Sequence, residues 1–444
     1  MKTQKVSRQR SPAAISGIVL KGFKSFADEE LLEIRPLTLL AGANSSGKSS
    51  ALQPLLLLKQ TLEATYDPGP LLLDGPHVKF SAASQLLTTL GGRDASEEWE
   101  IGVEVGEGFR LTNVFRRRPD EKFDLVCTSY GAIDIQLGMT SRELENVVPI
   151  LRKFRESAPV EISWFVVRNR CFLEIAAEGE EVYYLSGSLF PPLTAVLDST
   201  LRSLIHVPGL RGNLSRSYPT TAVEEHFPGT FEKYTASVIA NWQESGSNAL
   251  ARLNKTLGRL GLTHKITARS IDATQVELLV GRMPTTKHAT GNDLVNIADV
   301  GFGVSQVLPV LVALLVARAD QMVYIEQPEL HLHPRAQGEL AGVLADAVKR
   351  DVRVVVETHS DHLLLALQSL VAQGKLAPEK VKLHWFTRDS RGATKVDSAD
   401  IDQLGAYGEW PEDFGDVRAA VENRYLDAVE VRALEPRKHA KSKK

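Results

Sequence analysis

One short segment of the sequence has the residue types and spacing of a phosphate-binding loop. Residues 42–49 are Gly-Ala-Asn-Ser-Ser-Gly-Lys-Ser and match the pattern G-x-x-x-x-G-K-[ST] at every fixed position. The glycines allow backbone N–H groups to point at phosphate oxygens, while Lys48 is expected to reach the β- and γ-phosphates and Ser49 to ligate Mg²⁺. A glycine-rich turn that only caps a helix is the alternative. The predicted nucleotide-binding residues are Gly42, Ala43, Asn44, Ser45, Ser46, Gly47, Lys48, Ser49 and Ser50.

Acidic residues follow an apolar run further along the chain. Residues 323–329 are Val-Tyr-Ile-Glu-Gln-Pro-Glu. A phosphate loop needs a carboxylate at the end of a neighbouring strand to hold magnesium, and open α/β sheets bind ligands at that end. Glu326 is therefore predicted to hold Mg²⁺ together with Ser49. Plain surface acids after a core strand are the alternative.

Two further segments are candidates for the same sheet edge. Residues 357–360 are Glu-Thr-His-Ser, which puts His359 where it can sense a γ-phosphate or a water, unless it is merely hydrogen-bonded. Residues 299–306, Asp-Val-Gly-Phe-Gly-Val-Ser-Gln, form a glycine-rich turn before an apolar helix. Such a helix start is either a second anion site or a turn needed only for packing.

A metal site built from histidines competes with this interpretation. His331, His333, His359 and His362 have suggestive spacings for zinc. However, residues two apart point to opposite faces of a strand, and neither cysteine of the chain, Cys127 or Cys171, is near them. We therefore favour magnesium over zinc.

The elements that must position these residues alternate between strand and helix. The patterns predict an α/β fold with a parallel sheet, antiparallel hairpins elsewhere and no long coiled coil. Strands are predicted at 15–26, 37–40, 322–325, 352–356 and 381–386, hairpin-like strands at 98–117, 162–185 and 264–280, and helices at 52–62, 141–155, 230–260, 335–349 and 363–371.

Composition limits the class of protein. The chain has 444 residues with 52 basic and 55 acidic groups, a net charge of −3, so no global basic field favours nucleic acid. Its longest apolar stretch, 307–317, is shorter than the about 20 residues of a membrane span, and no secretory signal is recognised. We expect a cytoplasmic protein without membrane contact. The local basic clusters are Arg116 to Arg118, and Arg202, Arg211 and Arg216. We expect these arginines to be solvated or paired with acidic residues more often than bound to DNA.

These motifs together resemble a known family. Residues 20–26 and 37–44 resemble the opening of ABC-type ATPase heads of the chromosome-maintenance and recombination-repair class. Residues 326–334 with 357–360 are closer to the overcoming-lysogenization-defect ATPases and to AAA-family ATPases of bacterial antiphage systems, and residues 207–211 and 408–414 resemble further segments of these proteins. The resemblance implies that Glu326 is the Walker B carboxylate, His359 the switch histidine and Gln85 the Q-loop glutamine. It also implies that Gly303, Ser305 and Gln306 form a signature segment that completes the site of the opposite subunit.

Three departures from the family pattern matter. Gln327 occupies the position of the usual catalytic glutamate, so the resemblance implies slow ATP hydrolysis unless Glu329, the next acid, reaches the site. The signature is Gly-Phe-Gly-Val-Ser-Gln rather than Leu-Ser-Gly-Gly. Asp400 and Asp402 imitate an acid pair of a Toprim nuclease, but too few residues surround them to build that domain.

Lys48 and Ser305 are 257 positions apart, far more than one crossover connection between two strands of a sheet needs. We therefore expect an insert between the two parts of the ATPase head. We expect basic tails at 1–13 and 432–444, an ABC-type ATPase head split between 14–125 and 290–400, an α+β insert at 126–289 and a C-terminal module at 401–431.

Three functions fit these features. The first is an ATP- and Mg²⁺-dependent sensor or scaffold, a homodimer or higher oligomer, that controls a separately encoded effector such as a nuclease or toxin in antiphage defence, with possible contact to DNA or a phage component. The second is a DNA-repair ATPase that acts on DNA directly. The third is a nucleotide-binding structural protein with negligible turnover.

Overall fold

The computed structural model describes residues 14–90, 96–106, 108–131, 135–138, 163–178, 193–211, 215–223, 225–282 and 293–408, together with Arg424 and Leu426. The chain divides into two units, residues 1–406 and 407–444, and the elements below belong to the first. The predicted helix at 141–155, both predicted tails and most of the predicted module at 401–431 lie outside the described residues.

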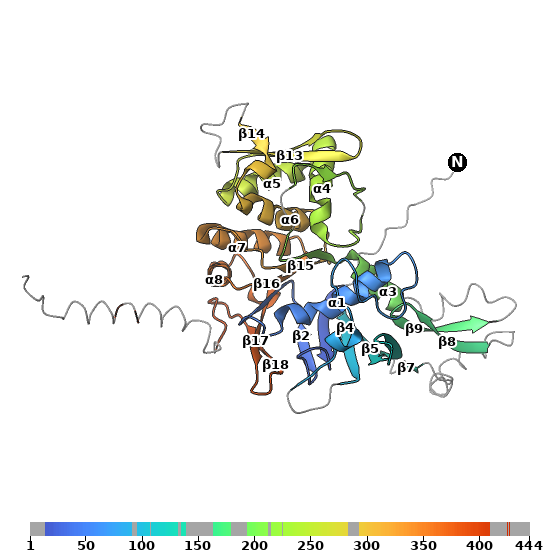
Figure 1. The fold of residues 1–444 in the computed structure, drawn as a ribbon. Helices are drawn as coiled ribbons and strands as arrows, with labels where there is room; N and C mark the ends of the chain where they lie inside the picture. The colour runs from blue at the N-terminus through green and yellow to red at the C-terminus, as the bar shows by residue number, and fades with distance from the viewer. Residues whose placement is uncertain are drawn as a thin grey trace, which may run out of the picture. The chain divides into compact units, whose positions relative to one another are not determined.

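A six-stranded sheet carries the phosphate loop (Figure 1). Its order is β10 (Ile205–Val207), β15 (Met322–Glu326), β16 (Arg353–Glu357), β3 (Leu37–Gly42), β17 (Val381–Arg388) and β18 (Thr394–Asp400). The first five strands are parallel and β18 pairs antiparallel with β17. Because β3 lies between β16 and β17, segments more than 300 residues apart in the chain build one sheet.

A second six-stranded sheet is antiparallel throughout. Its order is β2 (Glu30–Glu33), β1 (Ile15–Lys21), β4 (Glu98–Val105), β5 (Phe109–Arg117), β6 (Phe123–Tyr130) and β7 (Ile135–Gly138). The smaller sheets are the pair β8 (Ser163–Asn169) and β9 (Phe172–Glu178), and the group β11 (Tyr218–Pro219), β13 (Gln275–Gly281), β12 (Ile266–Ser270) and β14 (Leu294–Asn296). The predicted combination of a mostly parallel sheet with antiparallel β structure is confirmed.

Seven helices are described in this part of the chain: α1 (Lys48–Glu63), α3 (Leu193–Ser203), α4 (Thr235–Glu244), α5 (Asn248–Arg259), α6 (Phe302–Val316), α7 (Pro334–Val348) and α8 (Asp361–Ala372). Short 3₁₀ turns lie at Ala83–Leu86, Phe231–Tyr234, Ile297–Asp299 and Pro378–Lys380. The longest described helix, α1, has 16 residues, in agreement with the expectation that long coiled-coil arms are absent.

Helix α1 belongs to the main apolar core. Its leucines at 55–58 are almost fully buried and share one cluster with Trp99 of the antiparallel sheet and Tyr324 of the parallel sheet. Trp99 stacks on Phe115 with ring centroids 4.9 Å apart. Burial of apolar surface therefore holds the helix that follows the phosphate loop in a fixed position between the two sheets.

The structure also differs from the sequence-based expectations at several elements. The predicted helix at 230–260 is interrupted at Gly246, which has a φ of 64°, and Ser247 then caps α5 by accepting a hydrogen bond from the N–H of Ala249. Helix α3 was not predicted. Strand β10, in the predicted insert, pairs with β15, so residues of that region contribute to the central sheet.

Candidate functional site

The phosphate loop lies between β3 and α1, as its sequence predicts. Gly42 and Gly47 have φ values of 134° and 110°, and Ser45 between them has a φ of 59°. A Cβ atom at Gly47 would come within 2.4 Å of Oγ1 of Thr394, so both the backbone angle and the space require glycine there. This curled backbone leads directly into the N-terminus of α1, the geometry that binds anions.

Lys48 is buried with its ammonium group at the loop. Its Nζ donates to the carbonyl oxygens of Gly42 at 3.0 Å and Ala43 at 2.5 Å. Burial lowers its pKa, and the negative charge of Glu357 opposes this effect. No carboxylate bonds to the ammonium among the described contacts, so its charge is available to a phosphate that enters the loop.

Glu357 is the carboxylate that contacts the loop. The Ser49 hydroxyl donates to its Oε1 at 2.8 Å, and the Tyr324 hydroxyl donates to its Oε2 at 3.2 Å. Burial raises the pKa of Glu357, and the neighbouring Glu326 adds to the rise. The sequence contains this residue in the Glu-Thr-His-Ser segment, but only the sheet order reveals that it faces Ser49.

Glu326 has a different environment. Its Oε1 lies 3.0 Å from Nε2 of His206, and its Oε2 accepts a hydrogen bond of 3.0 Å from the N–H of Gly209. Burial alone would raise its pKa, but these contacts and the charge of Arg211 hold the pKa below its ordinary value. The structure thus brings Ser49 together with Glu357, whereas the sequence predicted a Ser49 and Glu326 pair.

Four predicted site residues line one pocket of about 320 Å³: Asn44, Gln327, Glu329 and His359. Gln327 has a φ of 45°, a strained value for a residue with a side chain. Oε1 of Glu329 accepts from the N–H of His359 at 2.7 Å, and its Oε2 has no partner among the described residues. Burial raises the pKa of Glu329. Burial lowers the pKa of His359, and the positive charge of Lys48 lowers it further.

The predicted signature segment lies apart from these groups. Gly303 approaches the carbonyl of His331, and the Ser305 hydroxyl donates to the carbonyl of Phe302 within the first turn of α6. Gln306 is buried and its amide donates to the carbonyl of Arg211 at 3.3 Å. Its side chain is therefore held within the chain's own fold, and a role at the site of an opposite subunit stays a prediction for this segment.

Gln85, the predicted Q-loop glutamine, is not brought to the phosphate loop. Its side chain is exposed and bonds to Ser81, accepting from the Ser81 N–H at 2.9 Å and donating to the Ser81 hydroxyl at 3.0 Å. Both residues belong to one local turn. A role at the nucleotide remains a prediction for Gln85.

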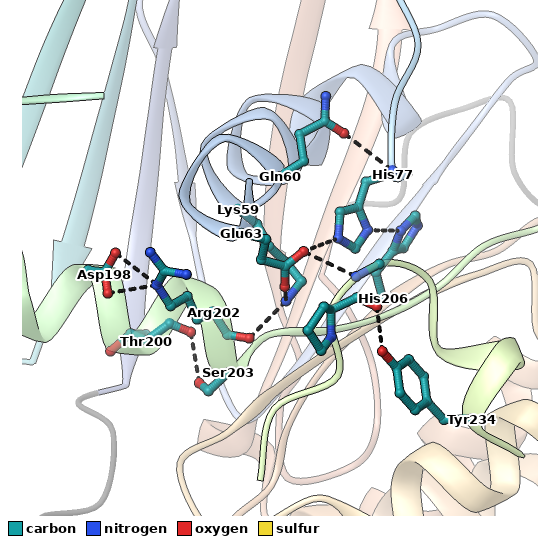
Figure 2. Close-up of polar contacts among 12 residues, drawn as sticks. Lys59, Gln60, Glu63, His77, Asp198, Thr200, Arg202, Ser203, His206 and Tyr234 are labelled. Atoms are coloured by element: carbon teal, nitrogen blue, oxygen red, sulfur yellow. Dashed lines mark hydrogen bonds and ion pairs between the residues drawn. The ribbon is translucent and has the colours of Figure 1, made fainter. Parts of the chain in front are cut away.

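A buried polar chain runs from helix α1 to His206 (Figure 2), and His206 in turn contacts Glu326. Lys59 is fully buried and contacts Glu63, and its Nζ donates to the carbonyl of Arg202 at 2.8 Å. Oε2 of Glu63 lies 3.3 Å from Nε2 of His77, and Nδ1 of His77 lies 3.1 Å from Nδ1 of His206. His206 then meets Glu326, so the chain connects the phosphate-loop helix with the Walker B position.

The two histidines join the carboxylates at either end of this chain through their ring nitrogens: Glu63 contacts His77, His77 contacts His206, and His206 contacts Glu326. Burial lowers the pKa of His77 to about 4, which favours the neutral form of that ring at neutral pH. Neither histidine was recognised as a site residue from the sequence, because they are 129 positions apart.

The alternative zinc site is not formed. No group of three or more His, Cys, Asp or Glu side chains that could hold a metal ion occurs in the described part of the chain. His331 and His359 line the pocket with Gln327, while Nδ1 of His333 accepts from the N–H of Arg335 as a helix cap.

The basic clusters are engaged within the protein. Arg211 is buried and donates to backbone carbonyls, and the exposed arginines pair with carboxylates: Arg116 with Glu98, Arg117 with Glu121, Arg118 with Asp120 and Asp124, Arg202 with Asp198, and Arg216 with Asp299. Cys127 and Cys171 are buried free thiols. Within the described residues, no helix has both the length and the apolarity to cross a membrane.

Comparisons with known proteins agree with an ATPase-like site. Residues 170–366 match a family described as "AAA domain, putative AbiEii toxin, Type IV TA system". This range contains α6, β15 and β16 but begins after the phosphate loop. No curated protein matches the chain. The family match and the loop geometry together support an ATPase-like nucleotide-binding domain that is similar to AAA domains.

Several solved structures resemble this chain over most of its length, each with a TM-score below 0.5. An Smc head bound to the C-winged helix domain of ScpA has a TM-score of 0.49 at 14% identity, covering 88% of this chain and 98% of that chain. An Smc head with an extended coiled coil bound to the C-terminal domain of ScpA, from Pyrococcus furiosus, has a TM-score of 0.46 at 13% identity, covering 94% and 99%. The SMC head domain from Thermotoga maritima has a TM-score of 0.39 at 11% identity, covering 87% and 100%.

The buried chain yields a stability prediction. Lys59→Met should lower the free energy of unfolding by about 3–5 kcal/mol, because it leaves the buried carboxylate of Glu63 without its cation. Lys349→Met is the matched control, since Lys349 forms an exposed pair with Asp346 and its loss should cost at most about 1 kcal/mol. Urea denaturation of the three proteins measures both effects. Similar losses in the two variants would show that the Lys59 contact contributes little.

Proposed function

We propose that this chain is a slow ATPase that uses bound ATP to hold two copies of itself together and so controls a separate effector protein. The observation that carries the proposal is the contact of Ser49 with Glu357 at the phosphate loop, beside the pocket lined by Gln327, Glu329 and His359. These groups are the parts that binding and hydrolysis of a nucleoside triphosphate require.

Ser49 and Glu357 suit a magnesium ion. Mg²⁺ prefers oxygen ligands and is usually bound by one or two protein groups together with substrate phosphates. A hydroxyl and a carboxylate already 2.8 Å apart at the loop supply such oxygens, and a cation there would favour the ionised form of Glu357 against the effect of burial. When bound, the ion would offset negative charge on the phosphates. Glu326, whose oxygens are held by His206 and Gly209, supports this group from the next strand.

Gln327 and Glu329 have different roles toward the water that attacks the γ-phosphate. The neutral amide of Gln327 can orient a water but cannot accept its proton, whereas Glu329 is a carboxylate in the same pocket. Burial raises the pKa of Glu329, which makes its ionised form a stronger base. However, Oε1 of Glu329 already accepts from the N–H of His359, and Oε2 is buried, which restricts the access of a water to this carboxylate. We therefore expect hydrolysis to be slow and ATP to act as a long-lived clamp.

A pair of substitutions tests this assignment. Glu329→Gln should lower the rate of phosphate release by at least about 100-fold, as expected for loss of a general base, with little change in ATP affinity. Gln327→Glu should change turnover less. Glu339→Gln, on the half-exposed face of α7, is the control and should behave as wild type. Wild-type turnover near the median enzyme rate of about ten per second would end the clamp proposal. Full turnover in Glu329→Gln would reject Glu329 as the base.

A second copy of the chain is proposed to complete the site. Phe302, the first residue of α6, lies against His331, and the Ser305 hydroxyl bonds to the carbonyl of Phe302, so Ser305 does not bond to the phosphate loop among the described contacts. The first N–H groups of this 15-residue helix form an anion site. We propose that this site binds the ATP that is held by the phosphate loop of the opposite copy. A two-fold interface would complete both sites at once.

Mixing two inactive variants tests the shared site. Lys48→Ala removes the phosphate lysine, and Ser305→Arg blocks the signature segment. Each alone should lack turnover. In a random mixture half of the dimers contain one of each, and each of these has one intact site, so about one quarter of wild-type turnover should return. Mixtures that stay inactive would show that the site does not join Lys48 of one copy with Ser305 of the other.

The wider role is proposed from the family match and the surface. The matched family is described as a putative toxin of a Type IV toxin–antitoxin system, which supports a role in a multi-component bacterial defence system. The arginines considered as DNA contacts are paired with carboxylates or buried, which favours control of an effector over direct action on DNA. We propose a cytoplasmic antiphage sensor whose ATP-bound dimer holds a nuclease or toxin.

A further inference from the structure

The hairpin of β17 and β18 forms one edge of the parallel sheet (Figure 1). Its first strand pairs with β3 as far as Phe386, which lies opposite Gly42, the first residue of the phosphate loop. A Cβ atom at Gly42 would collide with the carbonyl of Phe386, and one at Gly47 would collide with the hydroxyl of Thr394. The hairpin therefore lies directly against both glycines that the loop pattern requires.

Two side chains of this hairpin bond to carbonyl groups of the loop. Nε of Arg388, the last residue of β17, donates to the carbonyl of Ser45 at 2.9 Å. Oγ1 of Thr394, the first residue of β18, donates to the carbonyl of Ser46 at 2.8 Å. Because a hydroxyl has one proton, the Ser25 hydroxyl is the donor in its own contact of 2.7 Å with Oγ1 of Thr394. Two successive carbonyls of the loop are thus held by the hairpin.

Holding these carbonyls also directs the N–H groups of the same peptide units. A trans peptide unit is planar, so its N–H points away from its C=O. The unit that contains the Ser45 carbonyl carries the N–H of Ser46, and the unit that contains the Ser46 carbonyl carries the N–H of Gly47. Neither N–H donates to another backbone group among the described contacts. Both point away from their partners on the hairpin, as the anion-binding N–H groups of a phosphate loop must.

Arg388 places a positive charge behind the first of these peptide units. In the described part of the chain no carboxylate pairs with its guanidinium, and Nη1 donates to the carbonyl of Gly392 in the same hairpin. A donor at the carbonyl polarises the peptide unit and makes its N–H a stronger donor. The contact also supports the left-handed backbone of Ser45, whose φ of 59° persists only where the surroundings hold it.

We propose that Arg388 and Thr394 are positioning residues of the nucleotide site, which hold the N–H groups of Ser46 and Gly47 in the arrangement that binds phosphate. This inference rests on the proposed ATP site. A loop that is already ordered loses less conformational entropy when a ligand binds. Loss of either contact should therefore weaken the binding of every nucleotide that places a phosphate in the loop, ATP and ADP alike.

The affinities of the full chain for ATP and ADP, measured by calorimetry, test the inference. Arg388→Met should weaken both by about tenfold, because a charged hydrogen bond to the loop is lost. Thr394→Val should weaken both several-fold, whereas Thr394→Ser, which keeps the hydroxyl, should retain most of the affinity. Arg391→Met is the matched control and should not change the affinity, because Arg391 lies in the same hairpin but pairs with Asp28 and Asp389.

Two further measurements separate positioning from a general effect on stability. In nucleotide-free chain labelled with ¹⁵N-serine and ¹⁵N-glycine, Arg388→Met should move the amide proton resonance of Ser46 upfield, and Thr394→Val should do the same for Gly47. Arg391→Met should leave both resonances in place. Urea denaturation should give nearly the same free energy of unfolding for Arg388→Met and wild type, because Arg388 is exposed. Thr394 is buried, so if its valine variant fails to fold, Arg388→Met decides the test.

The outcomes distinguish this inference from the proposed function. Wild-type nucleotide affinity in Arg388→Met, or an unmoved Ser46 amide in that variant, would overturn the positioning role even though the wild-type chain binds ATP. Equal losses of affinity in Arg388→Met and Arg391→Met would overturn it as well. Failure of the wild-type chain itself to bind ATP would reject the proposed function, and the positioning role with it.

Discussion

The site depends on the parallel register of three neighbouring strands. In this register Glu326 of β15 lies opposite Glu357 of β16, and Glu357 lies opposite Leu40 of β3, two residues before the phosphate loop begins. The strands β15 and β16 are buried along most of their length, and a slip of one residue would turn every side chain to the other face and separate Glu326 from Glu357. The two carboxylates and the loop therefore meet at one sheet edge without any contact that is local in sequence.

Two adjacent carboxylates at one edge would repel each other, and the protein gives them different partners. Glu326 contacts His206 and accepts a hydrogen bond from the Gly209 N–H. Glu357 instead accepts from two neutral hydroxyls, of Ser49 and Tyr324, and carries a raised pKa. Both oxygens of Glu326 are engaged inside the protein, so Glu357 is the carboxylate that contacts the phosphate loop.

The sequence predicted the features that depend on a contiguous run of residues. The phosphate loop matches a contiguous pattern, and the strands at 322–325 and 352–356 and the helices at 335–349 and 363–371 are confirmed within a few residues. The partner of Ser49 could not be predicted, because it depends on which strand lies beside β3. His77 and His206 gave no signal for the same reason. Arg211 was considered as part of the family-like segment 207–211 and as a possible ion pair or DNA contact, but its burial against α6 was not predicted.

The most direct test of this account is the effect of Mg²⁺ on ATP affinity, measured by calorimetry for wild type, Glu357→Gln and Glu326→Gln, each with and without the metal. The account predicts that Glu357→Gln loses most of the metal-dependent gain in affinity while ATP binding without Mg²⁺ is kept, and that Glu326→Gln retains most of the gain. The account would be contradicted if Mg²⁺ increased the ATP affinity of Glu357→Gln as much as that of wild type but no longer increased the affinity of Glu326→Gln. That result would indicate Glu326 as the metal ligand.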